Sequence, residues 1–255
     1  MTRPTGLLER FISRIVQVAF LVAVGSAWYL AVRVGHVSRI LLPDPVSVWH
    51  QFVNVIATGD FVDDLGVTST ELAVAITVSV TSGITVGYVI SRSPFMIRVF
   101  EPLFAAIFSI PIILFLPLYV LFFGLGLASK IALGITISFF PISINTIAGF
   151  GNVDKVLVTA ARSMGANDFQ MFRYVLLPAA LPMVLTGVRM GFTVCLLSII
   201  ASETIASIAG LGHRIVNLAE NMEMARMFAY IVFVVVLAAS LNWAVSVLEA
   251  RGKWE

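Results

Sequence analysis

Long segments without charged side chains are the feature that most limits what this chain can fold into. A helix needs about 20 mostly apolar residues to cross ~30 Å of hydrocarbon. Away from segment ends, Arg189 is the one charged residue that interrupts such a stretch. We expect six membrane-spanning helices, at about residues 15–34, 68–90, 102–123, 131–150, 178–203 and 227–248.

The composition supports the same class. Apolar residues make up 59% of the 255 residues and charged residues 12%, against roughly 45–50% and about 25% in soluble domains. An ordinary water-soluble enzyme is therefore excluded, and a net charge of +2 implies no nucleic-acid partner. We predict an all-α, polytopic membrane protein that is a single transmembrane domain over 1–255, in contact with lipid.

Basic residues predict the orientation, because short cytoplasmic segments are enriched in Lys and Arg. With the N-terminus inside, the inner segments hold ten basic residues and the outer segments five. We therefore expect both termini in the cytoplasm. The alternative for the first segment is a cleaved signal peptide, since Gly25-Ser26-Ala27 is a small-x-small cleavage pattern. That would leave five spans, whereas the charge bias of the later loops fits six.

The cytoplasmic segment 151–175, named here the elbow, has the pattern of two short helices. Asp154 is placed to cap the first helix and Gly165 to end it, since glycine tolerates the left-handed conformation after a helix. Asn167 and Gln170 have capping-box spacing at the start of the second. Pro178 is expected to begin the next span. From the residues alone, an amphipathic segment lying on the membrane surface is the alternative.

The residues TAARSMGANDFQMFRYVLLPAALP at 159–182 resemble the EAA motif of ABC-importer permeases, roughly E-A-A-x-x-x-G-A followed by an apolar stretch and L-P. The motif's leading Glu is Thr159 here, so any ion pair of that carboxylate is absent. The resemblance extends along the chain and is strongest to the branch for nitrate, sulfonates and taurine, which includes permeases for pyrimidine precursors and aromatic acids. The further matching segments are LLPDPVSVW at 41–49, FGLGLASKI at 123–131, FFPISINTIAGF at 139–150 and GLGHRI at 210–215.

The resemblance implies a type I importer permease of the bacterial inner membrane, present as a homodimer. It implies two cytoplasmic ABC ATPase subunits docked on the elbow and an extracytoplasmic solute-binding protein. By alternating access the permease would pass a small polar solute inward, such as nitrate, a sulfonate, taurine or a small heterocyclic or aromatic acid. The residues that it assigns to ATPase coupling are Thr159, Ala160, Ala161, Gly165, Ala166, Asn167 and Phe169.

The chain itself has no G-x-x-x-x-G-K-[S/T] phosphate loop. ATP and Mg²⁺ are therefore expected on the partner ATPase, with no cofactor in this chain and no enzymatic activity of its own. Its histidines lack ligand spacing such as H-E-x-x-H, so no metal site is expected. An intramembrane enzyme would need a nucleophile and a base close together at membrane depth, and the sequence shows no such pair. A secondary transporter or channel fits six spans equally well, but it needs no docking elbow.

Polar and proline residues within the spans are candidates for the solute path. Glu203 and Arg189 are 14 residues apart, about 21 Å of helix, so at least one of them lies at membrane depth. Glu203 is the first path candidate, with a structural ion pair as its alternative, and Arg189 is expected near the inner boundary. Glu71 is expected to be a solvated rim charge near the outer surface, with a structural or gating role as its alternative. The remaining path candidates are Ser109, Asn145 and Ser138, each with helix packing as its alternative. Pro111 and Pro117 are candidates for bends in the third span with a structural or gating role.

Two glycine pairs, Gly83 with Gly87 and Gly187 with Gly191, have the G-x-x-x-G spacing that permits close crossing of helices in membranes. We interpret both pairs as packing sites rather than as parts of a solute site.

Overall fold

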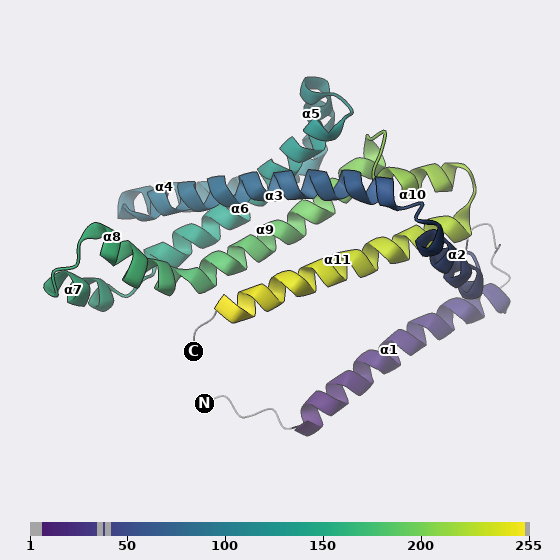
Figure 1. The fold of residues 1–255 in the computed structure, drawn as a ribbon, viewed down its shortest axis with the longest axis horizontal. Coiled ribbons are helices and arrows are strands. Elements are labelled where there is room, and N and C mark those ends of the chain that lie inside the picture. The colour runs from purple at the N-terminus through teal and green to yellow at the C-terminus, as the bar shows by residue number, and fades with distance from the viewer. Residues whose placement is uncertain (1–6, 35–37, 39–41, 253–255) are drawn as a thin grey trace. The chain divides into compact units, whose positions relative to one another are not determined.

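The computed structural model describes residues 7–34, 38 and 42–252, and every regular element within these ranges is a helix (Figure 1). The chain divides into a main unit, residues 60–216 and 233–255, and a smaller unit, residues 1–59 and 217–232. In chain order the elements are α1 (Leu7–Arg33), α2 (Pro45–Thr58), α3 (Val62–Ser91), α4 (Pro94–Phe108), the 3-10 helix η1 (Ile112–Phe115), α5 (Leu116–Phe123), α6 (Leu127–Gly151), α7 (Lys155–Ser163), α8 (Asp168–Met171), the π-helix η2 (Phe172–Leu176), α9 (Leu177–Ile205), α10 (Leu211–Glu220) and α11 (Met224–Gly252).

The number of candidate spans agrees with the sequence. Within the described ranges, five continuous helical segments are long and apolar enough to cross a membrane. A sixth span results if α4 and the η1–α5 segment, which meet at a 70° bend, are counted together. The predicted all-helical, multi-span fold is thus confirmed.

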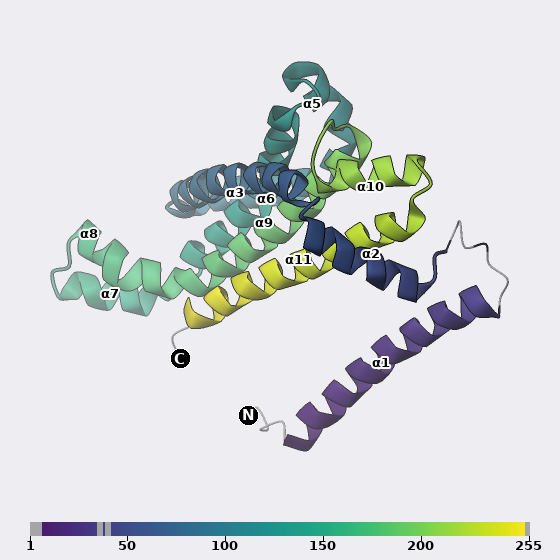
Figure 2. The ribbon, with the colours of Figure 1, turned by 45° about the vertical axis from the view of Figure 1, so that its right-hand side comes forward.

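Three long helices, α3, α6 and α9, pack side by side in the main unit, as both Figure 1 and Figure 2 show. Glycines make this close approach possible. A Cβ added at Gly87 would lie 2.6 Å from the Thr146 Cβ, and one at Gly191 would lie 2.6 Å from Ile142 Cγ1. At such distances a methyl group forces the helices apart, so the interpretation of both glycine pairs as packing sites is confirmed.

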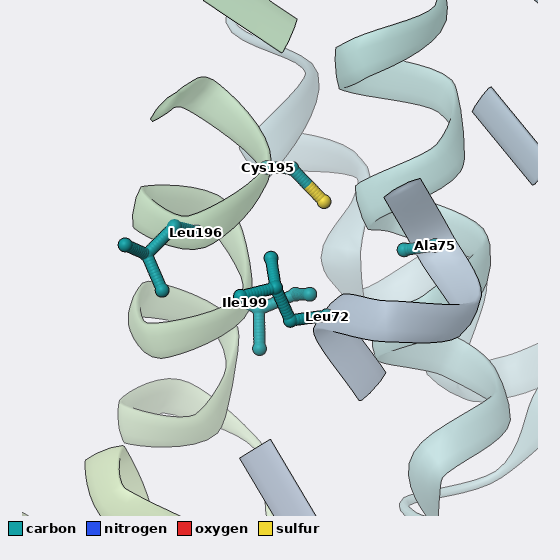
Figure 3. Packing of buried hydrophobic residues seen from close by; sticks show 5 residues of the cluster. All are labelled: Leu72, Ala75, Cys195, Leu196 and Ile199. Carbon is teal, nitrogen blue, oxygen red and sulfur yellow. The ribbon is translucent and has the colours of Figure 1, made fainter. Parts of the chain in front are cut away.

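The core between α3 and α9 is apolar. Leu72 and Ala75 of α3 meet Cys195, Leu196 and Ile199 of α9 (Figure 3). Cys195 is fully buried, and its sulfur behaves as a packing group. These buried positions on α9 define the face of that helix that points to its neighbours.

The third predicted span, 102–123, corresponds to a bent pair of helical segments rather than to one straight helix. Helix α4 begins earlier, at Pro94, and ends at Phe108, and the chain then turns by 70° before α5. Pro111 lies in the break with φ −69° and ψ 83°, outside any helix, whereas Pro117 lies in the first turn of α5, where a missing N–H costs nothing. Pro111 therefore accounts for the bend, and Pro117 does not.

The smaller unit contains α1 and α2. Asp44 caps α2, since its Oδ1 accepts a hydrogen bond of 3.2 Å from the Val46 amide. Trp28 of α1 donates its indole N–H to the Pro43 carbonyl over 3.2 Å, and its ring lies 5.8 Å from that of Phe228. These contacts hold the segment before α2 against α1.

Candidate functional site

The elbow folds as its capping residues predict. The Asp154 Oδ1 accepts a 2.8 Å hydrogen bond from the Val156 amide at the start of α7. At the other end, Gly165 has φ +81°, its amide donates to the Arg162 carbonyl, and the Ala166 amide donates to the Ala161 carbonyl. This pair of bonds is the Schellman pattern, which needs a left-handed residue at the position of Gly165.

The second elbow helix begins with the predicted capping box. The Gln170 amide donates to Asn167 Oδ1 over 2.8 Å, and the Asn167 amide donates to Gln170 Oε1 over 3.0 Å. Both bonds satisfy amides that the first helical turn leaves without a partner. The shape of the elbow is therefore set by its own sequence.

The predicted coupling residues differ in how much of each is exposed to solvent. Thr159 and Ala160 are exposed and line a shallow hollow of about 420 Å³, whereas Ala161 is buried inside the elbow. Phe169 is 68% exposed and Met164 is 81% exposed. Large apolar side chains presented to solvent by a well-capped turn are typical of a surface that another protein covers.

Pro178 lies in the first turn of α9, as expected, but helical structure also continues on its N-terminal side. The helical segment is continuous from Asp168 to Ile205, with the π-helix η2 ahead of Pro178. Proline removes one helical N–H, and its ring crowds the preceding turn of the helix. The wider π-helix η2 lies in that preceding turn. The elbow is consequently joined to α9 by unbroken helix.

An aromatic cluster ties the elbow to the main helices. The Phe172 ring of η2 lies 5.1 Å from the Tyr88 ring of α3 and 6.2 Å from the Phe150 ring of α6. Tyr88 and Phe150 are themselves 5.0 Å apart in edge-to-face geometry. The role of Phe172 as an anchor depends on partners that lie far away in the sequence.

Glu203 holds helix ends together through hydrogen bonds to two other segments. It is 1% exposed, its Oε1 accepts a 2.7 Å hydrogen bond from the Thr68 hydroxyl, and its Oε2 accepts one of 2.7 Å from the Gly212 amide. The Leu211 amide in turn donates to the Thr68 oxygen over 3.0 Å. We call this arrangement the Glu203 clasp, since it joins α3, α9 and the start of α10.

Glycines make room for the clasp. Gly210 has φ +105°, and a Cβ there would collide with the Glu203 carboxylate. At Gly212 a Cβ would lie 2.5 Å from the Ile200 carbonyl oxygen and 2.7 Å from the Glu203 Cβ. The segment GLGHRI thus contains two glycines that a packed carboxylate requires.

The expectation that Glu71 is a solvated rim charge is wrong. Its side chain is 0% exposed, because α3 begins at Val62 and presents Glu71 to the packed interior about two turns into the helix. Glu203 and Lys130 are the charged groups that act on it. Neither Glu71 oxygen has a hydrogen-bond partner in the described part of the chain, while Lys130 donates to the carbonyls of Leu125 and Gly126 over 2.7 and 3.0 Å.

The other candidates are scattered over the main unit. The fully buried Ser138 hydroxyl lies 2.7 Å from the Ser79 hydroxyl, and Asn145 Nδ2 donates to the Pro141 carbonyl over 2.8 Å beside Gly187. Both residues lie at helix crossings. Ser109 is exposed at the end of α4, and Arg189 is half-buried in the middle of α9.

The sequence is similar to a known protein family and to bacterial permeases. The model of one family, described as binding-protein-dependent transport system inner membrane component, matches residues 48–253. The taurine transport system permease protein TauC of Escherichia coli (strain K12) is 30% identical over 89% of this chain and 84% of the relative. The putative aliphatic sulfonates transport permease protein SsuC of the same organism is 28% identical over 89% of this chain and 87% of the relative.

Solved structures share the fold. An inward-facing structure of the MetNI methionine ABC transporter has a TM-score of 0.62 at 20% identity and covers 74% of this chain and 94% of that chain. The crystal structure of an amino acid ABC transporter with histidines has a TM-score of 0.60 at 20% identity, over 78% of this chain and 95% of that chain.

Proposed function

Because this chain belongs to the family of binding-protein-dependent transport system inner membrane components, we propose that it is the permease subunit of an ATP-driven importer. The observation that carries the proposal is the elbow: a double-capped turn with exposed apolar side chains, joined to α9 by continuous helix. Two ATPase subunits dock on the elbows of two permease copies. ATP and Mg²⁺ bind to those ATPase chains.

The elbow is built to transmit movement in this proposal. A displacement of α7 and α8 passes along η2 into α9, and through the Phe172 ring to Tyr88 of α3 and Phe150 of α6. Alternating access then follows from repacking of these helices, because packed interfaces move as units between discrete arrangements.

The proposed solutes are small organic acids of the sulfonate type, delivered by an extracytoplasmic binding protein. The relatives named for taurine and aliphatic sulfonates support this class.

Co-purification tests the proposal. The permease, expressed with its ATPase, should retain the ATPase through purification and should take up sulfonate into vesicles only with ATP and binding protein. Phe169→Ser removes a 68% exposed ring from the elbow and should weaken ATPase retention. Trp49→Ser removes a 62% exposed ring from α2, on the opposite side of the membrane in this proposal, and is the matched control. Uptake by the permease alone would instead identify a secondary transporter.

Orientation has its own test. Asp63 at the start of α3 and Ser163 at the end of α7 are both exposed. In a Cys195→Ser background, cysteine at Asp63 should react with an impermeant thiol reagent added outside intact cells. Cysteine at Ser163 should react only after the membrane is opened. Reaction of both from one side contradicts the proposed six-span topology with cytoplasmic termini.

A further inference from the structure

Three buried charged side chains meet where the outer ends of the core helices come together in the proposed orientation. Glu71 lies about two turns into α3, Lys130 lies in the first turn of α6, and Glu203 lies in the last turn of α9. Glu71 is 0% exposed, and the other two are each 1% exposed. Of the described charged groups, Glu203 and Lys130 are the ones that act on Glu71.

Two of these three groups have hydrogen-bond partners that suit their charge. The Glu203 oxygens accept the two bonds of the clasp. The Lys130 ammonium donates to the carbonyls of Leu125 and Gly126, and such acceptors favour its charged form. Glu71 differs, because the described residues supply no donor to either of its oxygens. As an ionised carboxylate it would be buried with none of the bonds that stabilise one.

The neighbour of Glu71 is a second carboxyl group. The side chains of Glu71 and Glu203 are within hydrogen-bonding contact of each other. Leu72, next to Glu71, packs in one cluster with Ile199, one turn before Glu203 (Figure 3). Two ionised carboxylates can only accept, so they form no hydrogen bond with each other. One proton makes Glu71 a donor and gives it the partner that it otherwise lacks.

The charge of the cluster points to the same single proton. Two ionised carboxyl groups beside the positive Lys130 leave one negative charge uncompensated, which is unfavourable away from water. One bound proton makes the cluster neutral. The charged groups at the start of α10 do not alter this balance. Arg214 Nε lies 3.8 Å from Asp64 Oδ2, and His213 also acts on Asp64.

We propose that Glu71 and Glu203 form a proton-binding site, in which protonated Glu71 donates to a Glu203 oxygen and Lys130 is the counter-charge. The site goes beyond the importer function, because its ligand is a proton and not the solute. It holds the proton while the outer ends of α3, α6 and α9 are packed together. When those ends part, water reaches the pair, and a hydrated glutamate loses its proton at neutral pH. Closing of the outer ends therefore takes up one proton.

Infrared spectroscopy of the purified complex tests the site. At about pH 7, in a detergent without ester groups, the difference between wild type and Glu71→Gln should contain the carbonyl band of a protonated carboxylic acid, shifted in D2O. Glu71→Gln should still assemble, since its amide N–H donates to Glu203 without a bound proton. Asp63→Asn removes an exposed carboxylate from the start of α3 and is the control, with no such band in its difference spectrum.

An ion pair between an ionised Glu71 and Lys130 is the competing arrangement. It predicts no carbonyl band in the difference spectrum, and loss of assembly in Glu71→Gln because Lys130 would keep a buried charge without its partner. Either result overturns the proton site.

Thiol labelling tests the link between the proton and closure. In a Cys195→Ser background, cysteine at the buried Ser129, next to Lys130, should react with an impermeant reagent in proportion to the parted form. Its rate is divided by that of cysteine at the exposed Asp63, which corrects for thiol ionisation. Because parting releases one proton, this ratio should rise about tenfold per pH unit near neutrality, and it should not change with pH in Glu71→Gln. A ratio independent of pH with Glu71 present overturns the coupling, and the importer function is unaffected because neither experiment uses solute.

Discussion

Gly165→Leu is expected to reduce transport several-fold while the permease remains inserted in the membrane. Gly165 has φ +81°, a conformation that costs a residue with a Cβ roughly 1–2 kcal/mol. A cost of ~1.4 kcal/mol shifts the equilibrium of the elbow about tenfold away from its capped form. There is no steric clash to add, because nothing lies within 4 Å of a Cβ built there. The effect should therefore appear in ATPase docking and transport, with the melting temperature of the helices little changed.

A second substitution at the same position separates conformation from size. Asparagine enters the left-handed region more readily than other residues with a Cβ, so Gly165→Asn should recover most of the transport that leucine removes. Gly66→Leu, in an open position of α3, serves as the control for adding a leucine side chain. Normal transport in Gly165→Leu at normal expression would show that the Schellman turn is not needed for coupling.

Local signals explain why the elbow was predictable. Asp154, Asn167 and Gln170 each bond to an amide within three residues, so the sequence contains both partners of every cap. The continuation of helix through Pro178 was not predictable in this way. It depends on a π turn whose Phe172 is held by rings from α3 and α6, which sequence spacing does not bring together.

The candidate site residues show the same limit. Glu71 and Glu203 were correctly located within or beside helices, but their surroundings depend on which face of each helix packs against its neighbours. Glu71 lies on the buried face of α3, so its expected exposure was wrong.

Glu203→Ala is expected to lower the melting temperature of the purified complex by about 5–10 °C. The substitution leaves the buried Gly212 amide and the Thr68 hydroxyl without the acceptor that each now has. Each unsatisfied group costs about 1–3 kcal/mol, and 1 kcal/mol corresponds to roughly 2–4 °C in a protein of this size. Gly212→Ala should have a comparable effect, because its Cβ meets the Ile200 carbonyl oxygen at 2.5 Å. Gly66→Ala, with open space around its Cβ, is the matched control and should not destabilise the complex.

Glu203→Gln then distinguishes a clasp from a solute contact. Glutamine keeps an oxygen that accepts from the Gly212 amide, and its nitrogen can donate to the Thr68 oxygen, so most of the clasp is retained. If Glu203 acts only by holding α3, α9 and α10 together, turnover per folded complex stays near normal in Glu203→Gln, and in Glu203→Ala below its melting point. If the carboxylate instead acts on the solute path, turnover falls in Glu203→Gln although the melting temperature hardly changes. Each carboxylate oxygen already accepts a hydrogen bond, from Thr68 and from Gly212, and the residue is only 1% exposed. The geometry therefore favours the first result, and the second result would make Glu203 a residue of the solute path.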